Sequence, residues 1–321
     1  MMYVPQQSVS RRVGILISVN AIKYRLGTFR LHVLLARRLC ELGYSVFSFD
    51  PAGIGDSEGE FEYKLLSEHY YDIQMGKYNN DLTDAVDYFM GAGALESLLV
   101  LGLCGGAISV LMEAGTDPRI DGLILLNIPV LVEDLKRRGH EDNAAKITSS
   151  KSAGALLRSK LHRATDAGFW RRLVRMEVDL AEEGRLVRRA VAVLMRRVWE
   201  RSRDMVSPQT KSFELTAPVS SHRLFNMHFQ RAFAQSIAAR KQMLFVFAEL
   251  DPWTWIFKSE FQDLVLRAGN AYESQYAVEL IPAANHIFSG RDSQKQLEQC
   301  IVGWLRKHHP VTEASQYAAV L

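Results

Sequence analysis

A cysteine between two glycines is the residue of this sequence best suited to chemistry. Cys104 lies in the pattern Gly102-Leu-Cys104-Gly-Gly106, which joins two apolar runs. The spacing is that of a nucleophile elbow, Gly-x-Ser-x-Gly, with sulfur in place of oxygen, and it predicts a strand, a sharp turn and a helix. The glycines are needed because strand and helix backbones crowd each other at such a turn. A thiol at the apex of the turn lies at the positive end of the helix, which favours a role as nucleophile. The alternative interpretation is that Cys104 is a small buried apolar residue.

A cysteine nucleophile needs a base to take its proton and a third group to orient that base. Of the nine histidines, His286 is the one expected at the carboxyl edge of a sheet, because it falls in the loop 282–289 between the last expected strand and the final helix. Asp251 directly follows another apolar strand, and the order nucleophile, acid, histidine is the one that such elbows use. Since Asp-Pro also begins turns, Glu249 remains an alternative acid.

Two main-chain N–H groups are candidates for stabilising an oxyanion: that of Gly105, directly after the nucleophile, and that of Ala21, in the loop after the first expected strand. The side chains expected to line the substrate pocket are Asn20, Phe169, Trp170, Trp253 and Trp255. No H-E-x-x-H motif and no paired Cys/His spacing occurs, so no metal is expected. The glycine-rich loop 50–59 has Glu58 where a dinucleotide-binding motif needs its third glycine, so no cofactor is expected either.

Strand-like and helix-like segments alternate along most of the chain. Apolar runs at 13–19, 44–49, 98–103, 120–127, 243–251 and 276–281 predict strands, and amphipathic segments at 29–41 and 293–307 predict helices. Strands that are apolar throughout indicate a parallel sheet covered on both faces. After residue 130 the strand-like runs vanish and Arg and Lys become dense, which indicates a helical lid inserted in the α/β core. The expected boundaries are 1–130 and 241–310 for the two parts of the core, 131–240 for the lid and 311–321 for a loose tail.

Composition limits the classes of protein to consider. The chain has 321 residues, of which 48% are hydrophobic, and a formal net charge of +3, as expected for a globular protein that does not bind nucleic acid. Three cysteines without a C-x-x-C pair argue against a disulfide framework and for a reducing, cytoplasmic location. We expect neither a secretory signal nor a membrane span, because the N-terminus lacks the first and no apolar run has the length of the second.

The elbow together with the candidate base and acid resembles the α/β-hydrolase fold, and the resemblance covers essentially the whole chain. A narrower likeness is carried by the segments 102–107, 49–59, 169–173 and 285–289. These are similar to the exosortase-associated, cysteine-nucleophile hydrolases and to the cysteine enzymes that shuttle aminoacyl groups between carrier domains in nonribosomal peptide pathways. The resemblance implies an acyl-enzyme on Cys104, with Asp251 and His286 completing a triad. The aromatic stretch 252–255 departs from the pattern and indicates a different acyl pocket.

The choice of cysteine favours a thioester substrate. After attack on an ordinary ester, the intermediate expels the thiolate rather than the alkoxide and returns to substrate, whereas attack on a thioester carries no such bias. We therefore expect an acyltransferase or thioesterase whose substrate is tethered through phosphopantetheine, with an acidic carrier protein docking on the basic lid. An esterase or lactonase and a non-catalytic binding protein of the same fold are the alternatives. The sequence leaves open which acceptor takes the acyl group and whether the lid forms a homodimer.

Overall fold

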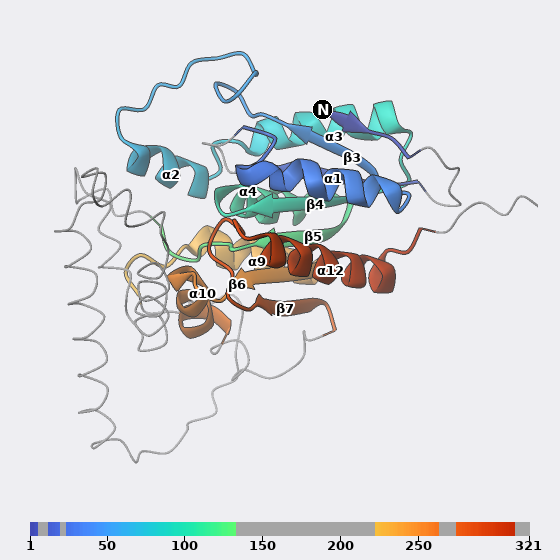
Figure 1. Ribbon diagram of the computed structural model, residues 1–321. Coiled ribbons are helices and arrows are strands. Elements are labelled where there is room, and N and C mark those ends of the chain that lie inside the picture. The colour runs from blue at the N-terminus through green and yellow to red at the C-terminus, as the bar shows by residue number, and fades with distance from the viewer. Residues whose placement is uncertain (6–11, 20–23, 133–221, 263–273, 312–321) are drawn as a thin grey trace, which may run out of the picture.

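The structure, a computed structural model, describes residues 1–5, 12–19, 24–132, 222–262 and 274–311. Within them seven strands form one sheet in the order β1-β3-β2-β4-β5-β6-β7 (Figure 1). The strands are β1 (Met2–Tyr3), β2 (Val13–Ser18), β3 (Ser45–Phe49), β4 (Ser97–Leu103), β5 (Ile120–Leu126), β6 (Gln242–Ala248) and β7 (Tyr276–Ile281). The edge pair β1 and β3 is antiparallel, and every other neighbouring pair is parallel.

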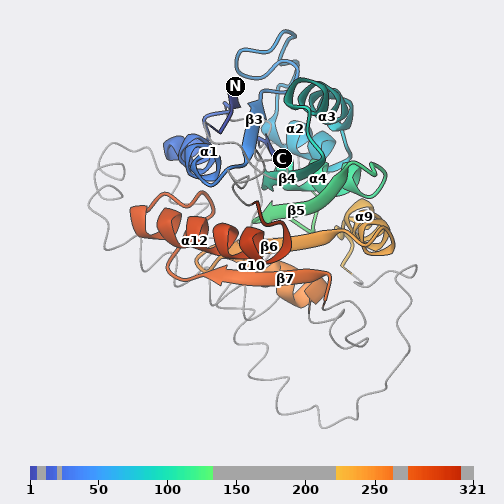
Figure 2. The ribbon, with the colours of Figure 1, turned by 90° about the vertical axis from the view of Figure 1, so that its right-hand side faces the viewer.

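Helices cover both faces of this sheet. They are η1 (Thr28–Arg30), α1 (Leu31–Glu41), α2 (Leu66–Gln74), α3 (Asn79–Gly93), α4 (Gly105–Ala114), α9 (Met227–Ala238), α10 (Pro252–Phe257), the π-helical turn η2 (Lys258–Gln262) and α12 (Arg291–His308). Figure 2 shows α1 and α12 on one face of the sheet and α3, α4 and α9 on the other. The mostly parallel, doubly covered sheet expected from the sequence is therefore confirmed.

The alternation of side chains along β4 explains the two layers of core. Leu98 and Val100 belong to the apolar cluster that contains α3, α4 and α9, whereas Leu99 and Leu101 belong to the cluster that contains α1 and α12. All of these side chains are fully buried, because a central parallel strand has protein on both faces. This burial holds the carboxyl end of β4, and with it Cys104, in a fixed position.

Several details differ from the expectation. The short antiparallel strand β1 at the sheet edge was not predicted, and β6 ends at Ala248 rather than continuing to residue 251, where Asp251 is the N-cap of α10. Helix α9 falls within the range expected for the lid, yet it packs against α4 in the core. The remainder of that range, 133–221, lies outside the described residues, as does the expected tail from 312 on. None of the helices in the described segments has the length and apolar character needed to span a membrane.

Candidate active site

Cys104 sits on a strained turn between β4 and α4. Its backbone has φ 54° and ψ −117°, a left-handed region that side chains rarely adopt. The flanking glycines make the turn feasible: a Cβ on Gly102 would lie 2.5 Å from the carbonyl oxygen of Gly106, and a Cβ on Gly106 would lie 2.6 Å from that of Val19. Strain of this kind is typical of functional sites, because the surrounding fold must hold it in place.

The residue after the nucleophile presents an N–H group to the same place. Gly105 is the first residue of α4, so its N–H has no partner within the helix. Ile73 of α2 packs against Gly105, since a Cβ there would lie 2.9 Å from the Ile73 side chain. Gly105, the expected oxyanion donor, therefore has its N–H at the first turn of α4, next to Cys104. The second expected donor, Ala21, and the neighbouring Asn20 lie outside the described residues.

His286 lies in the loop between β7 and α12, at the carboxyl edge of the sheet. Its Nδ1 is 2.5 Å from Oδ2 of Asp251, whose side chain is 2% exposed, while that of His286 is 32% exposed. Burial alone disfavours the charged ring, but the Asp251 carboxylate, the Cys104 sulfur and hydrogen bonds to both raise the pKa of His286 well above its ordinary value. With Nδ1 on the carboxylate, Nε2 is the nitrogen left for the thiol.

Asp251 both caps a helix and contacts the candidate base, two roles that the sequence analysis treated as alternatives. It is the N-cap of α10, and Oδ1 accepts a hydrogen bond from the Trp253 N–H at 3.1 Å. The other oxygen faces His286. Glu249 instead accepts a hydrogen bond from the Ala283 N–H at 3.0 Å through Oε2, which ties the histidine loop to the end of β6. The structure thus brings Asp251 to the imidazole ring, and Glu249 to the backbone of the same loop.

Asn127, a residue that the sequence analysis did not single out, joins three strand ends. It follows β5 with φ 45° and is fully buried. Its Nδ2 donates to the His286 carbonyl at 2.7 Å, and its Oδ1 accepts from the Ala248 N–H at 2.8 Å. Its own N–H donates to the Val246 carbonyl at 2.9 Å. The sequence signal that could have identified Asn127 is its position as a polar residue at the end of the apolar run 120–127, because burying an amide is costly unless it is hydrogen-bonded.

The segment that follows β2 is held by a buried carboxylate. Asp50, 6% exposed, accepts a hydrogen bond from the Arg25 N–H at 2.6 Å and a second, charged one from the Arg25 guanidinium. The same guanidinium contacts Asp56 at 2.7 Å, and the Tyr24 hydroxyl donates to Asp56 at 2.5 Å. These contacts tie the chain after the expected oxyanion loop to the loop after β3.

Two of the expected pocket residues, Trp253 and Trp255, lie on α10. Trp253 is half-buried on α10 against the α3, α4 and α9 side of the core. Trp255, on the same helix, donates from its indole nitrogen to the Glu249 carbonyl at 3.2 Å. Phe169 and Trp170 lie outside the described residues. In the segments that the structure describes, no group of histidine, cysteine and carboxylate side chains could hold a metal ion.

Strand order and site together define the class of fold. An antiparallel edge strand, a parallel run of strands and a strained turn at Cys104 between strand and helix, with an aspartate and a histidine in contact after later strands, are the features of the α/β-hydrolase fold. No model of a known protein family matches the sequence, and no curated protein matches it.

Solved structures with a similar course of the chain include several esterases and hydrolases. Est1E from Butyrivibrio proteoclasticus, solved with ferulic acid, shares 15% identity over 96% of this chain and 93% of its own, with a TM-score of 0.47. A serine hydrolase without a lid from Xanthomonas campestris shares 14% over 97% and 89%, with a TM-score of 0.46. An esterase from Pyrococcus furiosus shares 12% over 96% and 89%, with a TM-score of 0.49. The topology and elbow of this chain, rather than these likenesses, define its fold.

Proposed function

We propose that this protein is an acyl-transfer enzyme that forms a covalent acyl-cysteine on Cys104. The observation that carries the proposal is the chain of contacts from Cys104 to His286 to Asp251, with the nucleophile on a strained elbow. The substrate is a thioester on a carrier protein or on pantetheine. The acceptor is a second thiol, an amine or water.

In the first step, Nε2 of His286 takes the thiol proton and Sγ of Cys104 attacks the thioester carbonyl carbon. The carbonyl oxygen becomes an oxyanion that the N–H of Gly105 stabilises. Collapse of the intermediate breaks the bond to the substrate sulfur, which leaves as a thiol with the proton held on Nε2. Asp251 keeps Nδ1 protonated and so directs Nε2 toward the sulfur.

The second step runs the same sequence with a new nucleophile. His286 takes a proton from the acceptor, which attacks the acyl carbon and releases the Cys104 thiolate, and the thiolate then recovers the proton. Because the acyl-enzyme is itself a thioester, exchange with a substrate thioester is close to thermoneutral. This chemistry favours transfer between thiols over hydrolysis. It also favours a thioester over an ordinary ester as substrate, because the intermediate formed from an ester expels the Cys104 thiolate and returns to substrate.

An acidic carrier protein fits the charge of the chain. The range 131–240, rich in Arg and Lys, supports docking of such a carrier, because opposite charges steer association. The absence of a C-x-x-C pair among three cysteines supports action in a reducing, cytoplasmic compartment. No resident cofactor takes part in the proposed reaction, and phosphopantetheine enters only as part of the substrate.

Intact-protein mass spectrometry tests the proposal directly. The enzyme is mixed with a panel of acyl- and aminoacyl-pantetheine thioesters, and we expect a mass increase equal to the acyl group. Cys104→Ala is expected to show none, whereas Cys300→Ala, which removes a thiol from α12 instead, is expected to load as the unaltered chain does. The lifetime of the adduct in water, compared with that in added carrier thiol, separates a thioesterase from a transferase.

Two results would contradict the proposal. Loading that persists in Cys104→Ala would assign the acyl group to another residue. The absence of both adduct and turnover with every thioester would favour an ester substrate or a binding protein that has the triad without using it.

A further inference from the structure

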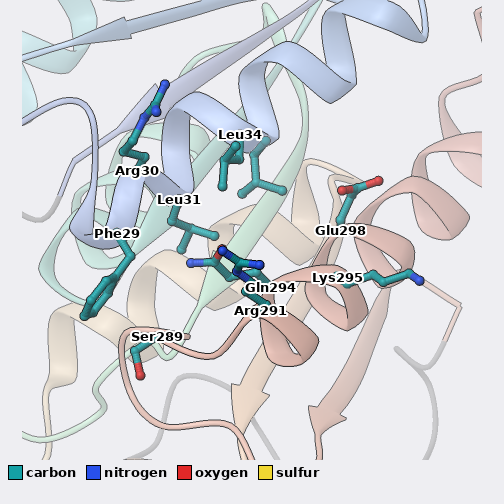
Figure 3. A pocket seen from close by; sticks show the side chains of 10 residues that line it. Phe29, Arg30, Leu31, Leu34, Ser289, Arg291, Gln294, Lys295 and Glu298 are labelled. Carbon is teal, nitrogen blue, oxygen red and sulfur yellow. The ribbon is translucent and has the colours of Figure 1, made fainter. Parts of the chain in front are cut away.

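A hollow of about 590 Å³ lies between the N-terminal halves of α1 and α12. Its volume is within the range of small-molecule sites. Figure 3 shows Leu31 and Leu34 of α1 across from Arg291 and Gln294 of α12, with Phe29 and Ser289 at one end and Lys295 and Glu298 at the other. We call this hollow the α1–α12 groove.

The charge of the groove is positive. Arg30, Arg291 and Lys295 line it, and within the described segments no carboxylate forms an ion pair with any of them. The one carboxylate among the lining residues, Glu298, accepts a hydrogen bond from Nε of Arg38 at 3.1 Å, and Arg38 also contacts Glu41, so the three cations of the lining outnumber its single carboxylate. The groove therefore favours an anionic ligand.

Apolar side chains and neutral polar groups line the rest of the groove. Leu31 and Leu35 are buried beneath it, and Leu34 and Phe29 are 45% and 60% exposed at its rim. Gln294 and Ser289 add an amide and a hydroxyl. A ligand that suits this lining has an apolar stem with amide groups and ends in an anion.

The backbone at the mouth of the groove is strained. Phe29 and Arg30 are consecutive residues with φ of 53° and 61°, the left-handed region that favours glycine. Strain at two adjacent residues persists only where the fold compels it, and it often marks ligand-binding segments. Here it holds a large aromatic ring out toward solvent beside the groove.

The groove is connected to the triad through the histidine loop. Ser289 lines the groove and belongs to the same loop as His286. Asn285 closes this loop on itself: its Nδ2 donates to Ser289 Oγ at 2.7 Å, and its Oδ1 accepts from the Ser289 N–H at 3.0 Å. The other wall begins at Phe29, in the segment that leads from β2 to α1. The histidine loop and the segment before α1 thus join one end of the groove to the sheet edge at which Cys104 lies.

We propose that the α1–α12 groove binds the phosphopantetheine arm of the thioester substrate, with its phosphate on Arg291 and Lys295 and its thioester end toward Cys104. This inference rests on the proposed function for the identity of the arm. The apolar walls take the methyl-bearing stem, and Gln294 and Ser289 take its amides. Arg30 lies beside Phe29, at the end of the groove opposite Lys295, so the phosphate is assigned to Arg291 and Lys295 alone.

A binding measurement tests the groove without any chemistry. Isothermal titration calorimetry of the full chain carrying Cys104→Ala compares 4′-phosphopantetheine with pantetheine, which differ only in the phosphate. We expect the phosphorylated ligand to bind roughly tenfold more tightly at low salt and the preference to shrink as ionic strength rises. Adding Arg291→Gln and Lys295→Gln is expected to reduce the preference to about one. Arg37→Gln with Lys307→Gln also removes two positive charges, one from α1 and one from α12, outside the groove lining and is expected to retain the preference.

The outcomes separate the two proposals. Equal binding of the two ligands, or a preference that survives the loss of Arg291 and Lys295, would overturn the groove as the phosphate site, whatever the enzyme does. A phosphate preference that depends on these residues, with no acyl loading of Cys104 from any thioester, would support the groove and contradict the proposed function. Coenzyme A is measured alongside: tighter binding than 4′-phosphopantetheine would support the phosphate site with coenzyme A as its source, and equal binding would support a carrier-borne arm.

Discussion

Two histidines follow the carboxyl ends of strands in this fold, and their surroundings give them opposite proton affinities. His32, 1% exposed at the start of α1, has its pKa lowered to about 4 by burial. The pKa of His286 is raised instead, although burial acts against it, because Asp251 and Cys104 stand beside its ring. Burial alone therefore makes an imidazole neutral and inert, whereas a buried carboxylate makes it a proton carrier.

Burial also makes two of the three thiols poor nucleophiles, and this gives the largest expected effect. Burial, followed by the charge of Glu279, raises the pKa of Cys300 to about 12, and burial followed by Glu41 raises that of Cys40. At pH 7 a thiol with a pKa near 12 is ionised to an extent on the order of 10⁻⁵, so it reacts slowly. We expect limiting iodoacetamide to label one site, which peptide mass spectrometry locates at Cys104, and Cys104→Ser to remove the label. Label spread evenly over the three thiols would show that the His286 region gives Cys104 no advantage.

Asp251→Asn is expected to give His286 the character of His32. An asparagine still caps α10, so the helix remains, but the charge that raises the pKa of His286 is lost. We expect the pKa of the ring, followed by NMR, to fall, and acyl loading of Cys104 to slow by about 10³-fold. Glu249→Gln is the matched control, since Oε2 of this carboxylate accepts from the Ala283 N–H, whereas Asp251 is the carboxylate on Nδ1 of His286. Equal losses in both variants would show that general loss of charge at this edge, rather than the carboxylate on Nδ1, is responsible.

His32 is expected to control how stability depends on pH. Between its folded pKa of about 4 and its unfolded pKa near 6.5, the unfolded chain binds a proton that the folded chain does not, so stability falls as the pH is lowered through this window. The full effect is about 3 kcal/mol. Urea unfolding at pH 7 and pH 4.5 should show a smaller difference for His32→Gln than for the unaltered chain. The exposed His228→Gln serves as control, and an unchanged difference in His32→Gln would refute the assignment.

Substitution of Asn127 tests how far the position of the His286 ring depends on the hydrogen bonds that hold the histidine loop. The effect expected on acyl loading is the smallest among these predictions. Asn127→Ala removes the hydrogen bonds to the His286 carbonyl and the Ala248 N–H, at a cost of about 2 kcal/mol in stability. We expect loading of Cys104 to slow roughly tenfold through misplacement of the ring. Val86→Ala, a buried truncation on α3 of similar cost, should unfold as readily yet load normally. Equal loading by the two variants would make Asn127 a purely structural residue.

Local pattern was sufficient for much of the fold. The apolar runs for β2, β4 and β5 predicted strands to within a residue or two, because a buried parallel strand is apolar on both faces. The elbow could be recognised from its spacing, and Gly102 is needed by backbone contacts within a few residues of Cys104, whereas Gly106 is needed by the backbone of Ser18 and Val19 at the end of β2. The edge strand β1 has only two residues and carries no such pattern.

By itself the sequence determined the order of strands and helices, the position of the elbow and the choice of Cys104, Asp251 and His286 as candidates, since each depends on short-range spacing. Only the tertiary structure decided that Asp251 both caps α10 and contacts His286, that Asn127 holds the His286 loop 159 residues away in sequence, and that α1 and α12 enclose a basic groove. The physical reason is that these contacts form between segments distant along the chain, where hydrogen-bond geometry and packing rather than local periodicity select the partners.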